Sequence, residues 1–360
     1  MGKRYIFATL LTVLTVCSCS NNDDLEPRPE LEHECVNLII DTDLGNSTDD
    51  LLAIQGAFAY QSVGDCRILA VMTSRGKHDV QRFADATMHY YHADDIPLGT
   101  TPGEESFFEI VPYYKLVDMK DEQGNPMMQE SGIPLSSRME SPELYRKILS
   151  EAPDHSVVIA CIGFTTNIGK LLDSKPDKYS PLNGVDLIKQ KVKSMSMMGC
   201  LFAKVKQRYS DELLNAEYNI LGDIPLAQKL FREWPVALHV FPVEGGLVFP
   251  SDHDQVIHDY SWQPDNPIYK TYTHFDEWQT GDLGQYWWDI IPMVHAIQGE
   301  RYFDCTDNGN ITIKDDGQSD FVLDDKGKCH IISFNAVHYK TIYEALRIFS
   351  SYNPDNVTRL

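Results

Sequence analysis

Four aspartates, Asp41, Asp43, Asp49 and Asp50, lie within ten residues of one another in the chain. Carboxylates held so close together repel one another, and each raises the pKa of its neighbours. A bound cation removes that repulsion, and a ligand set made only of oxygen atoms favours Ca²⁺ or Mg²⁺ over zinc. The residues therefore predict a hard-cation site. They also leave open that Asp49 and Asp50 only complement a helix dipole while Asp41 and Asp43 cap a turn.

The segments on either side of these acids predict how the acids are held. Residues 36–40 form a short, mostly apolar run rich in branched residues, which is typical of a buried strand. Residues 49–54 begin a helix, with the two acids in its first turn and apolar residues behind them. A loop at the carboxyl end of such a strand faces the crevice where α/β proteins bind ligands. This position favours the cation site over the capping alternative.

Further along the chain, strands and helices alternate at the spacing of an α/β protein with a mostly parallel sheet. We expect strands at 67–72, 96–99, 157–160, 192–198 and 236–241, helices at 79–91 and 340–349, and a hairpin around 311–313. Another helix should open at Ser141, with the serine as its cap and Pro142 at its first position. Residues 100–140 are predicted to form a long excursion. The aromatic-rich stretch 260–288 is predicted to be a loop region, which either stacks on a nucleobase or forms a packed satellite cluster.

Composition limits the classes of partner. The 360 residues include 53 acidic and 31 basic side chains, so the net charge is −22. This charge argues against nucleic acid as a partner, because binding a phosphate backbone requires a basic face.

The first 35 residues have the pattern of an export signal followed by a tether. Lys3 and Arg4 precede an apolar run over 6–16 that is too short to span a membrane as a mature helix. Residues 16–19 then resemble a bacterial lipobox with Cys19 as the lipidated residue. We expect a signal peptide over 1–18, a disordered tether over 19–35 and one catalytic domain over 36–360. The protein would be exported and lipid-anchored to a bacterial membrane, facing the periplasm or the cell surface. An ordinary cleaved secretory signal is the alternative.

Six cysteines follow the lipobox, at 35, 66, 161, 200, 305 and 329, and none has metal-ligand spacing such as C-x-x-C. Outside the cytoplasm, a disulfide between Cys305 and Cys329 is compatible with the sequence, which does not establish the pairing.

The acidic stretch carries a family resemblance. Asp-Thr-Asp-x-Gly at 41–45 followed by Asp-Asp-x-x-Ala at 49–53 resembles the signature of the inosine-uridine-preferring nucleoside hydrolases. The family usually has one residue between the glycine and the paired aspartates, whereas Asn46, Ser47 and Thr48 stand here. The resemblance implies a Rossmann-like, mostly parallel open sheet flanked by helices, and a Ca²⁺-dependent N-glycosyl hydrolase.

Three later segments extend the resemblance in the same order. Residues 163–167 are similar to the family's Gly-x-x-Thr-Asn turn, although an ordinary helix cap at Thr166 and Asn167 explains them equally well. Residues 216–219, Ala-Glu-Tyr-Asn, are similar to Ala-Glu-Phe-Asn, and in an extended segment Glu217 and Asn219 would face the same side. Trp288 and Asp289 stand in the place of the family's His-Asp-Pro.

The resemblance implies a role for each matching residue. The metal would be held by Asp43, Asp50, Asp289 and the main-chain carbonyl of Ile162. Asp43 would also be the general base. The ribosyl hydroxyls would be oriented by Asp49, Glu217 and Asn219, together with Asp211, which stands where the family has an asparagine. Asp41 and Asn167 would support the loop from behind.

Two departures bear on the chemistry. Trp288 stands in the place of the family's histidine, and tryptophan cannot deliver a proton to a leaving base. His274 and His295 are the alternative acids. The family's asparagine after the second strand is also missing from the local sequence at 73–77.

These residues predict Ca²⁺-dependent hydrolysis of a ribonucleoside to free base and ribose. The alternatives are a noncatalytic surface lipoprotein that binds a sugar or nucleoside through its metal, or a hydrolase of another ribosyl glycoside. A structural calcium site in an adhesion module fits less well, because such sites rarely gather ligands from strand ends so distant in sequence. The partner is then a small molecule, contact with a membrane is limited to the lipid anchor, and a homo-oligomer is left open.

Overall fold

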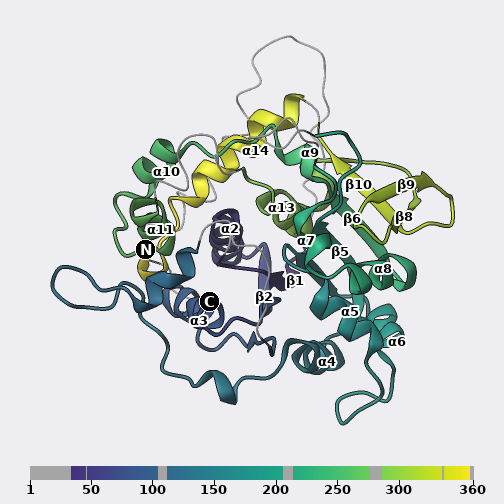
Figure 1. Cartoon of the computed structure of the whole chain (residues 1–360), viewed down its shortest axis with the longest axis horizontal. Coiled ribbons are helices and arrows are strands. Elements are labelled where there is room, and N and C mark those ends of the chain that lie inside the picture. Colours follow the sequence, from purple (N-terminus) through teal and green to yellow (C-terminus); the bar gives the residue numbers. More distant parts are fainter. Residues whose placement is uncertain are drawn as a thin grey trace.

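The computed structural model describes residues 34–45, 47–103, 112–205, 214–275, 286–334 and 336–356. Ten strands of this part form one sheet in the order β3-β2-β1-β4-β5-β6-β10-β8-β9, with β7 paired to β10 (Figure 1). The first six strands follow the order of a doubly wound Rossmann sheet. The strands are β1 (Val36–Thr42), β2 (Cys66–Thr73), β3 (Leu98–Gly99), β4 (Val157–Cys161), β5 (Val192–Met198), β6 (Ala237–Phe241), β7 (Asp304–Cys305), β8 (Gly309–Ile313), β9 (Ser319–Leu323) and β10 (Cys329–Ser333).

The strands β1 to β6 are parallel to one another, and β10 continues this parallel arrangement beside β6. β8 and β9 form the antiparallel hairpin that the turn residues predict. The predicted fold class, a mostly parallel open sheet flanked by helices, is therefore confirmed.

Helices cover both faces of the sheet, as Figure 1 shows. One face packs against α2 (Asp49–Val63), α3 (His78–Tyr90), α13 (Ile290–Gln298) and α14 (Ala336–Phe349). The other packs against α4 (Ser141–Glu151), α5 (Thr166–Asp173), α6 (Gly184–Lys191) and α8 (Ile224–Glu233). Leu38 and Ile40 of β1 face the first layer and Ile39 faces the second. Burial on both faces explains why β1 is a continuous apolar run rather than an alternating one.

Shorter elements complete the described chain. They are the helices α7 (Tyr218–Gly222), α9 (Val243–Gly246), α10 (His253–Tyr260) and α11 (Pro267–His274), and the 3-10 turns η1 (Tyr113–Asp118), η2 (Leu135–Ser137), η4 (Gly299–Tyr302) and η5 (Pro354–Asn356). No helix among the described residues is long and apolar enough to cross a membrane.

Four local predictions are wrong. Ser141 does not cap α4, because its hydroxyl donates to the carbonyls of Thr73 and Thr100 instead, at 3.2 Å each. The aromatic stretch is partly helical, because Pro267 starts α11 rather than interrupting it. The segment at Glu217 is not extended, because the glutamate is the N-cap of α7. The last helix begins at Ala336, four residues before its predicted start.

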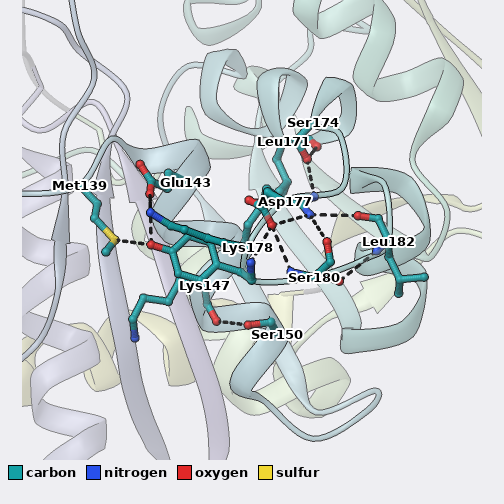
Figure 2. Close-up of polar contacts among 12 residues, drawn as sticks. Met139, Glu143, Lys147, Ser150, Leu171, Ser174, Asp177, Lys178, Ser180 and Leu182 are labelled. Atoms are coloured by element: carbon teal, nitrogen blue, oxygen red, sulfur yellow. Dashed lines mark hydrogen bonds and ion pairs between the residues drawn. The ribbon is translucent and has the colours of Figure 1, made fainter.

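A buried arginine fastens the loop between α5 and α6 to α4. The Arg146 guanidinium donates to both carboxylate oxygens of Asp177, at 2.7 and 3.0 Å, and to the hydroxyl of Ser174 at 2.9 Å. It also reaches the carbonyls of Ser180 and Leu182. Figure 2 shows these loop residues gathered around Asp177. This bidentate pair lowers the pKa of Asp177 to about 2.

The described cysteines are free thiols, and Cys305 and Cys329 do not form the disulfide considered from the sequence. Cys305 stands opposite Ile332 in the β7–β10 pair, so Cys329 lies three residues, about 10 Å, further along β10. The expected signal peptide and nearly all of the tether lie outside the described residues.

Candidate active site

The site forms at the switch point of the sheet, where β1 and β4 lie side by side although their helices cover opposite faces. Asp43 follows the end of β1, and Ile162 and Gly163 follow the end of β4. A β-carbon on Gly163 would lie only 2.3 Å from the main-chain nitrogen of Asp43. Glycine is therefore required for the two strand ends to meet at this distance.

Three carboxylates converge beside this point. Asp49 and Asp50 are the first two residues of α2, and Asp289 is the N-cap of α13. One carboxylate oxygen from each of these three residues lies within 4.8 Å of the other two. Each of these residues is at most 5% exposed. The main-chain amide of Asp289 donates to Asp49 Oδ2 at 3.1 Å, so the first turns of α2 and α13 are joined directly.

The two carboxylate oxygens of Asp50 differ in their hydrogen bonding. The Thr42 hydroxyl donates to Asp50 Oδ1. Asp50 Oδ2 is buried with no hydrogen-bond partner among the described residues. A buried carboxylate oxygen without a donor is costly to maintain. Three buried carboxylates and this open oxygen fit a hard divalent cation with oxygen ligands.

The electrostatics of the cluster support the same fit. Burial, followed by the charges of Asp43 and Asp49, raises the pKa of Asp50 well above its ordinary value. Burial and the charges of Asp49, Asp50 and Asp43 do the same to the pKa of Asp289. Asp43 is not one of the three acids whose oxygens lie within 4.8 Å of one another. Its charge nevertheless raises the pKa of both Asp50 and Asp289.

Asp41 accepts hydrogen bonds from two side chains that lie outside the acidic loop. Its carboxylate accepts from the Tyr145 hydroxyl at 2.9 Å and from Asn167 Nδ2 at 3.0 Å. Asn167 also donates to the carbonyl of Thr73 at 2.8 Å, which ties β1 and β2 to the start of α5. Burial raises the pKa of Asp41 to about 7 in spite of these hydrogen bonds.

The acidic loop, which is two residues longer than in the family pattern, is held by two tyrosines from distant segments. The Tyr113 hydroxyl accepts from the Gly45 amide at 2.9 Å and donates to the Ser47 carbonyl at 2.6 Å. The Tyr272 hydroxyl lies 3.2 Å from the Thr48 hydroxyl. The excursion after β3 and helix α11 therefore shape the loop that carries the acids.

Of the other residues predicted to hold the ribose, Glu217 and Asn219 are described, and the charge of Glu217 acts on Asp289. Glu217 is buried, and its oxygens accept from the main-chain amides of Asn219 and Ile220 at 2.7 and 2.9 Å. Burial raises the pKa of Glu217 to about 8, and the charge of Asp43 adds to this rise. Asn219 is also buried, with Nδ2 3.5 Å from the carbonyl of Met198 at the end of β5. Asp211 lies outside the described residues.

Trp288 forms part of an apolar wall next to Asp289. Its indole nitrogen donates to the carbonyl of Val243 at 2.9 Å, and the ring packs with Met198 and Val243. A β-carbon on Gly246 would lie 1.9 Å from the indole, so that glycine makes room for the ring.

Neither histidine proposed as a substitute acid is suited to that task. Burial lowers the pKa of His295 to about 3, so its ring is neutral near pH 7 and is only a very weak acid. His295 contacts Ser196 and Cys305. His274 is exposed at the end of α11, with Nδ1 2.8 Å from the carbonyl of Lys270.

Sequence reasoning missed Arg75, Tyr113 and Tyr272. Arg75 is fully buried just after β2, and its positive charge lowers the pKa of Asp50. A charged residue two positions after a buried strand was the available signal for Arg75. The tyrosines carry no such signal, because their role depends on tertiary placement.

Comparisons with known proteins identify a family and several structures of the same fold. The family described as inosine-uridine preferring nucleoside hydrolase matches residues 38–341. A plant nucleoside hydrolase is 19% identical, with a TM-score of 0.65, and the match covers 88% of this chain and 98% of that one. An inosine-uridine preferring nucleoside hydrolase from Bacillus anthracis is 12% identical, with a TM-score of 0.63 and coverage of 88% and 99%. A purine-preferring ribonucleoside hydrolase from Gardnerella vaginalis is 15% identical, with a TM-score of 0.63 and coverage of 88% and 98%.

No curated protein sequence matches the chain significantly. The family match nevertheless spans most of the chain and includes every described residue that the sequence placed in the site. The resemblance seen in the acidic stretch is confirmed: the chain belongs to the inosine-uridine preferring nucleoside hydrolase family and is an N-glycosyl hydrolase.

Proposed function

We propose that this protein is a Ca²⁺-dependent N-glycosidase that hydrolyses a ribonucleoside to free base and ribose. The observation that carries the proposal is the convergence of Asp49, Asp50 and Asp289, which leaves Asp50 Oδ2 buried and without a donor among the described residues. A helix-capping role alone does not explain that oxygen, because a capping carboxylate accepts hydrogen bonds from main-chain amides.

The ion would be held by Asp43, Asp50, Asp289 and the Ile162 carbonyl, as the family resemblance implies. Asp49 is an additional candidate, because its carboxylate lies in the same cluster. A bound Ca²⁺ supplies positive charge that lowers the pKa of water and favours vicinal hydroxyls as ligands.

The chain's own residues have three tasks in this reaction. Asp43 accepts a proton from the attacking water as general base. Asp49, Glu217, Asn219 and Asp211 orient the ribosyl hydroxyls. Burial of the site excludes bulk water, which strengthens the interaction of these groups with an oxocarbenium-like transition state.

Departure of the base is the step for which this chain differs from the family pattern. Trp288 has no proton to deliver and uses its indole N–H on Val243. We therefore expect preference for a leaving group that needs little protonation. The same substitution favours the second candidate function, a surface lipoprotein that binds a nucleoside or sugar without turnover. A hydrolase of another ribosyl glycoside is the third, and the clamped, lengthened loop favours it.

Export and lipidation at Cys19 remain part of this proposal and rest on the sequence of the first 19 residues alone. Mass spectrometry of the mature protein should find a diacylglycerol-modified cysteine at its N-terminus. An unmodified N-terminus at a later residue would instead indicate an ordinary cleaved signal.

The first experiment measures reducing-sugar release from purine and pyrimidine ribonucleosides, with and without chelator. Chelator-sensitive release that Ca²⁺ restores supports the proposal and identifies the substrate. Nucleoside binding without release supports the noncatalytic alternative. Release from another ribosyl glycoside alone supports the third.

Asp43→Ala should reduce hydrolysis to background while the protein stays folded, because the variant removes the proposed base without creating a large cavity. Circular dichroism and the melting temperature check the fold. Near-normal turnover in this variant would remove Asp43 from the mechanism.

A further inference from the structure

A second cluster of metal-ligating side chains lies on the same helix as Asp289 but at its other end. It consists of His239 in β6, His295 in α13 and Cys305 in β7, and one ligand atom from each lies within 4.8 Å of the others. Cys305 Sγ is 3.7 Å from His239 Nδ1 and 3.7 Å from His295 Nε2. Neither the family resemblance nor the proposed hydrolysis uses these three residues.

These spacings fit a metal ion placed between the three atoms. Tetrahedral zinc has Zn–S bonds of about 2.3 Å and Zn–N bonds of about 2.0 Å, which puts sulfur and nitrogen ligands roughly 3.6 Å apart. Two imidazoles and a thiolate are soft or borderline ligands, so the site would select Zn²⁺ and reject Ca²⁺. This cluster therefore prefers a different metal ion from the all-oxygen cluster at the start of α13.

Neighbouring groups hold two of the rings in a ligating orientation. Ser196 Oγ lies 2.7 Å from His295 Nδ1, which leaves Nε2 directed at Cys305. The ring of His330 stacks on His239 with centroids 4.9 Å apart, and His330 Nδ1 is 3.0 Å from the Thr306 carbonyl. The Ser196 contact is of the kind that metal-binding histidines make, because a hydrogen bond at the second ring nitrogen fixes the tautomer and the ring plane.

We propose that His239, His295 and Cys305 bind one Zn²⁺ ion, with a water molecule in the fourth position. His239 and Cys305 are only partly buried, so the ion can enter from solvent. Binding forms a Zn–S bond, and the thiol proton of Cys305 passes to solvent.

The ion would join three elements that are far apart in sequence. It links the middle of β6, the short strand β7 and the C-terminal half of α13. His295 is six residues, or about 9 Å along the helix axis, from Asp289. Zinc would therefore anchor the helix whose first turn carries an acid of the other cluster.

The test uses Co²⁺ as a spectroscopic substitute for Zn²⁺ on the full chain, reduced and saturated with Ca²⁺. We expect one equivalent of Co²⁺ to produce a thiolate-to-cobalt charge-transfer band, which one equivalent of Zn²⁺ abolishes. Cys305→Ser should remove the band, and Cys329→Ser, a change at a buried cysteine in β10, should keep it. Asp50→Asn should also keep it, because that residue belongs to the other cluster.

Two results overturn the proposal. One is the absence of a charge-transfer band in the wild-type protein, which would mean that the three residues form only a hydrogen-bonded packing cluster. The other is a band of full intensity in Cys305→Ser. If that variant does not fold, His239→Gln provides the same test at a partly exposed position. It should weaken Zn²⁺ binding by roughly 100-fold in competition with a chromophoric chelator, and unchanged affinity would exclude the site.

Discussion

Replacing Asp50 with asparagine should stabilise the Ca²⁺-free protein and remove most of the stabilisation that Ca²⁺ provides. Asparagine has the shape of aspartate and can keep the hydrogen bond from Thr42, so the change mainly removes one negative charge. That charge lies within 4.8 Å of the carboxylates of Asp49 and Asp289. A metal ligand should therefore show a gain in stability without Ca²⁺ and a loss of the stabilisation by Ca²⁺. A residue that only caps a helix should show neither effect.

The Coulomb energy sets the size of the first effect. Two unit charges separated by 4.8 Å repel by about 3.5 kcal/mol at an effective dielectric constant of about 20. The positive charge of Arg75 offsets part of this repulsion, so the Coulomb energy is an upper limit. We therefore expect Asp50→Asn to raise the unfolding free energy of the Ca²⁺-free protein by about 1–2 kcal/mol at pH 8.

Mass action sets the size of the second effect. At a Ca²⁺ concentration of about 100 times Kd, the wild-type protein gains about 2.7 kcal/mol from the bound ion. Loss of a direct ligand should weaken binding by at least the roughly 100-fold seen for lost outer contacts. At the same Ca²⁺ concentration, the variant would gain only about 0.4 kcal/mol.

Urea unfolding of both proteins, in chelator and in Ca²⁺, measures all four free energies. Asp223→Asn is the matched control, because this aspartate caps α8 and an asparagine can do the same. The control should keep the full Ca²⁺ effect. The reasoning fails if Asp50→Asn keeps it too, or if that change destabilises the Ca²⁺-free protein by more than about 1 kcal/mol, which is the cost of a lost cap.

Three further predictions follow from hydrogen bonds and pKa values outside that trio. In chelator, the unfolding free energy should fall as pH rises from about 4 to about 8. The raised pKa values of Asp41, about 7, and Glu217, about 8, make the folded protein keep protons that the unfolded chain has lost. Their contribution is fully present below the unfolded pKa values near 4, so a rise in stability over this range in urea titrations would contradict the assignment. Arg146→Ala should lower the free energy of unfolding, measured in urea, by about 2–4 kcal/mol, because it breaks five buried or half-buried hydrogen bonds. The control Lys147→Ala, which removes an exposed ion pair, should lower it by less than about 0.5 kcal/mol. Tyr113→Phe should lower the free energy of unfolding by about 1–3 kcal/mol and weaken Ca²⁺ binding measured by calorimetry, because the acidic loop loses both hydrogen bonds to that hydroxyl. Full Ca²⁺ affinity in this variant would mean that the loop keeps its shape without Tyr113.

Much of the fold follows from local patterns in the sequence. β5 has the bounds that its apolar run predicts, and the hairpin of β8 and β9 forms where turn residues flank Ile311 and Ile313. The order of the strands is different in kind. Asn37 of β1 pairs with Val157 of β4 across 119 intervening residues, and no local pattern encodes that partner. The alternation of strands and helices predicted a mostly parallel sheet, the family resemblance implied a Rossmann-like one, and neither named the partner of each strand.

The site divides in the same way. Its acids lie next to strand and helix ends, where residue type and position together indicate chemistry, and the sequence named them. Tyr113 and Tyr272 act through single hydroxyls brought from distant segments, so their contribution appears only in the fold. Glu217 was expected in an extended segment, because a helix as short as α7 leaves no periodic pattern to detect. The proposed zinc ligands form no recognisable metal-binding motif in the sequence, because 56 and 10 residues separate them.

The charge balance of the acidic cluster explains why a divalent ion suits it better than a monovalent one. Asp43, Asp49, Asp50 and Asp289 contribute four negative charges when ionised. The buried guanidinium of Arg75 offsets one of them. The N-terminal ends of α2 and α13 each contribute about half a positive charge, which offsets roughly one more. About two negative charges remain, which one Ca²⁺ neutralises and which Na⁺ or K⁺ would leave half balanced. Arg75 thus sets the charge of the ion that the site accepts: replacing it with a neutral residue should leave about three negative charges beside one Ca²⁺ and raise the pKa of Asp50 further.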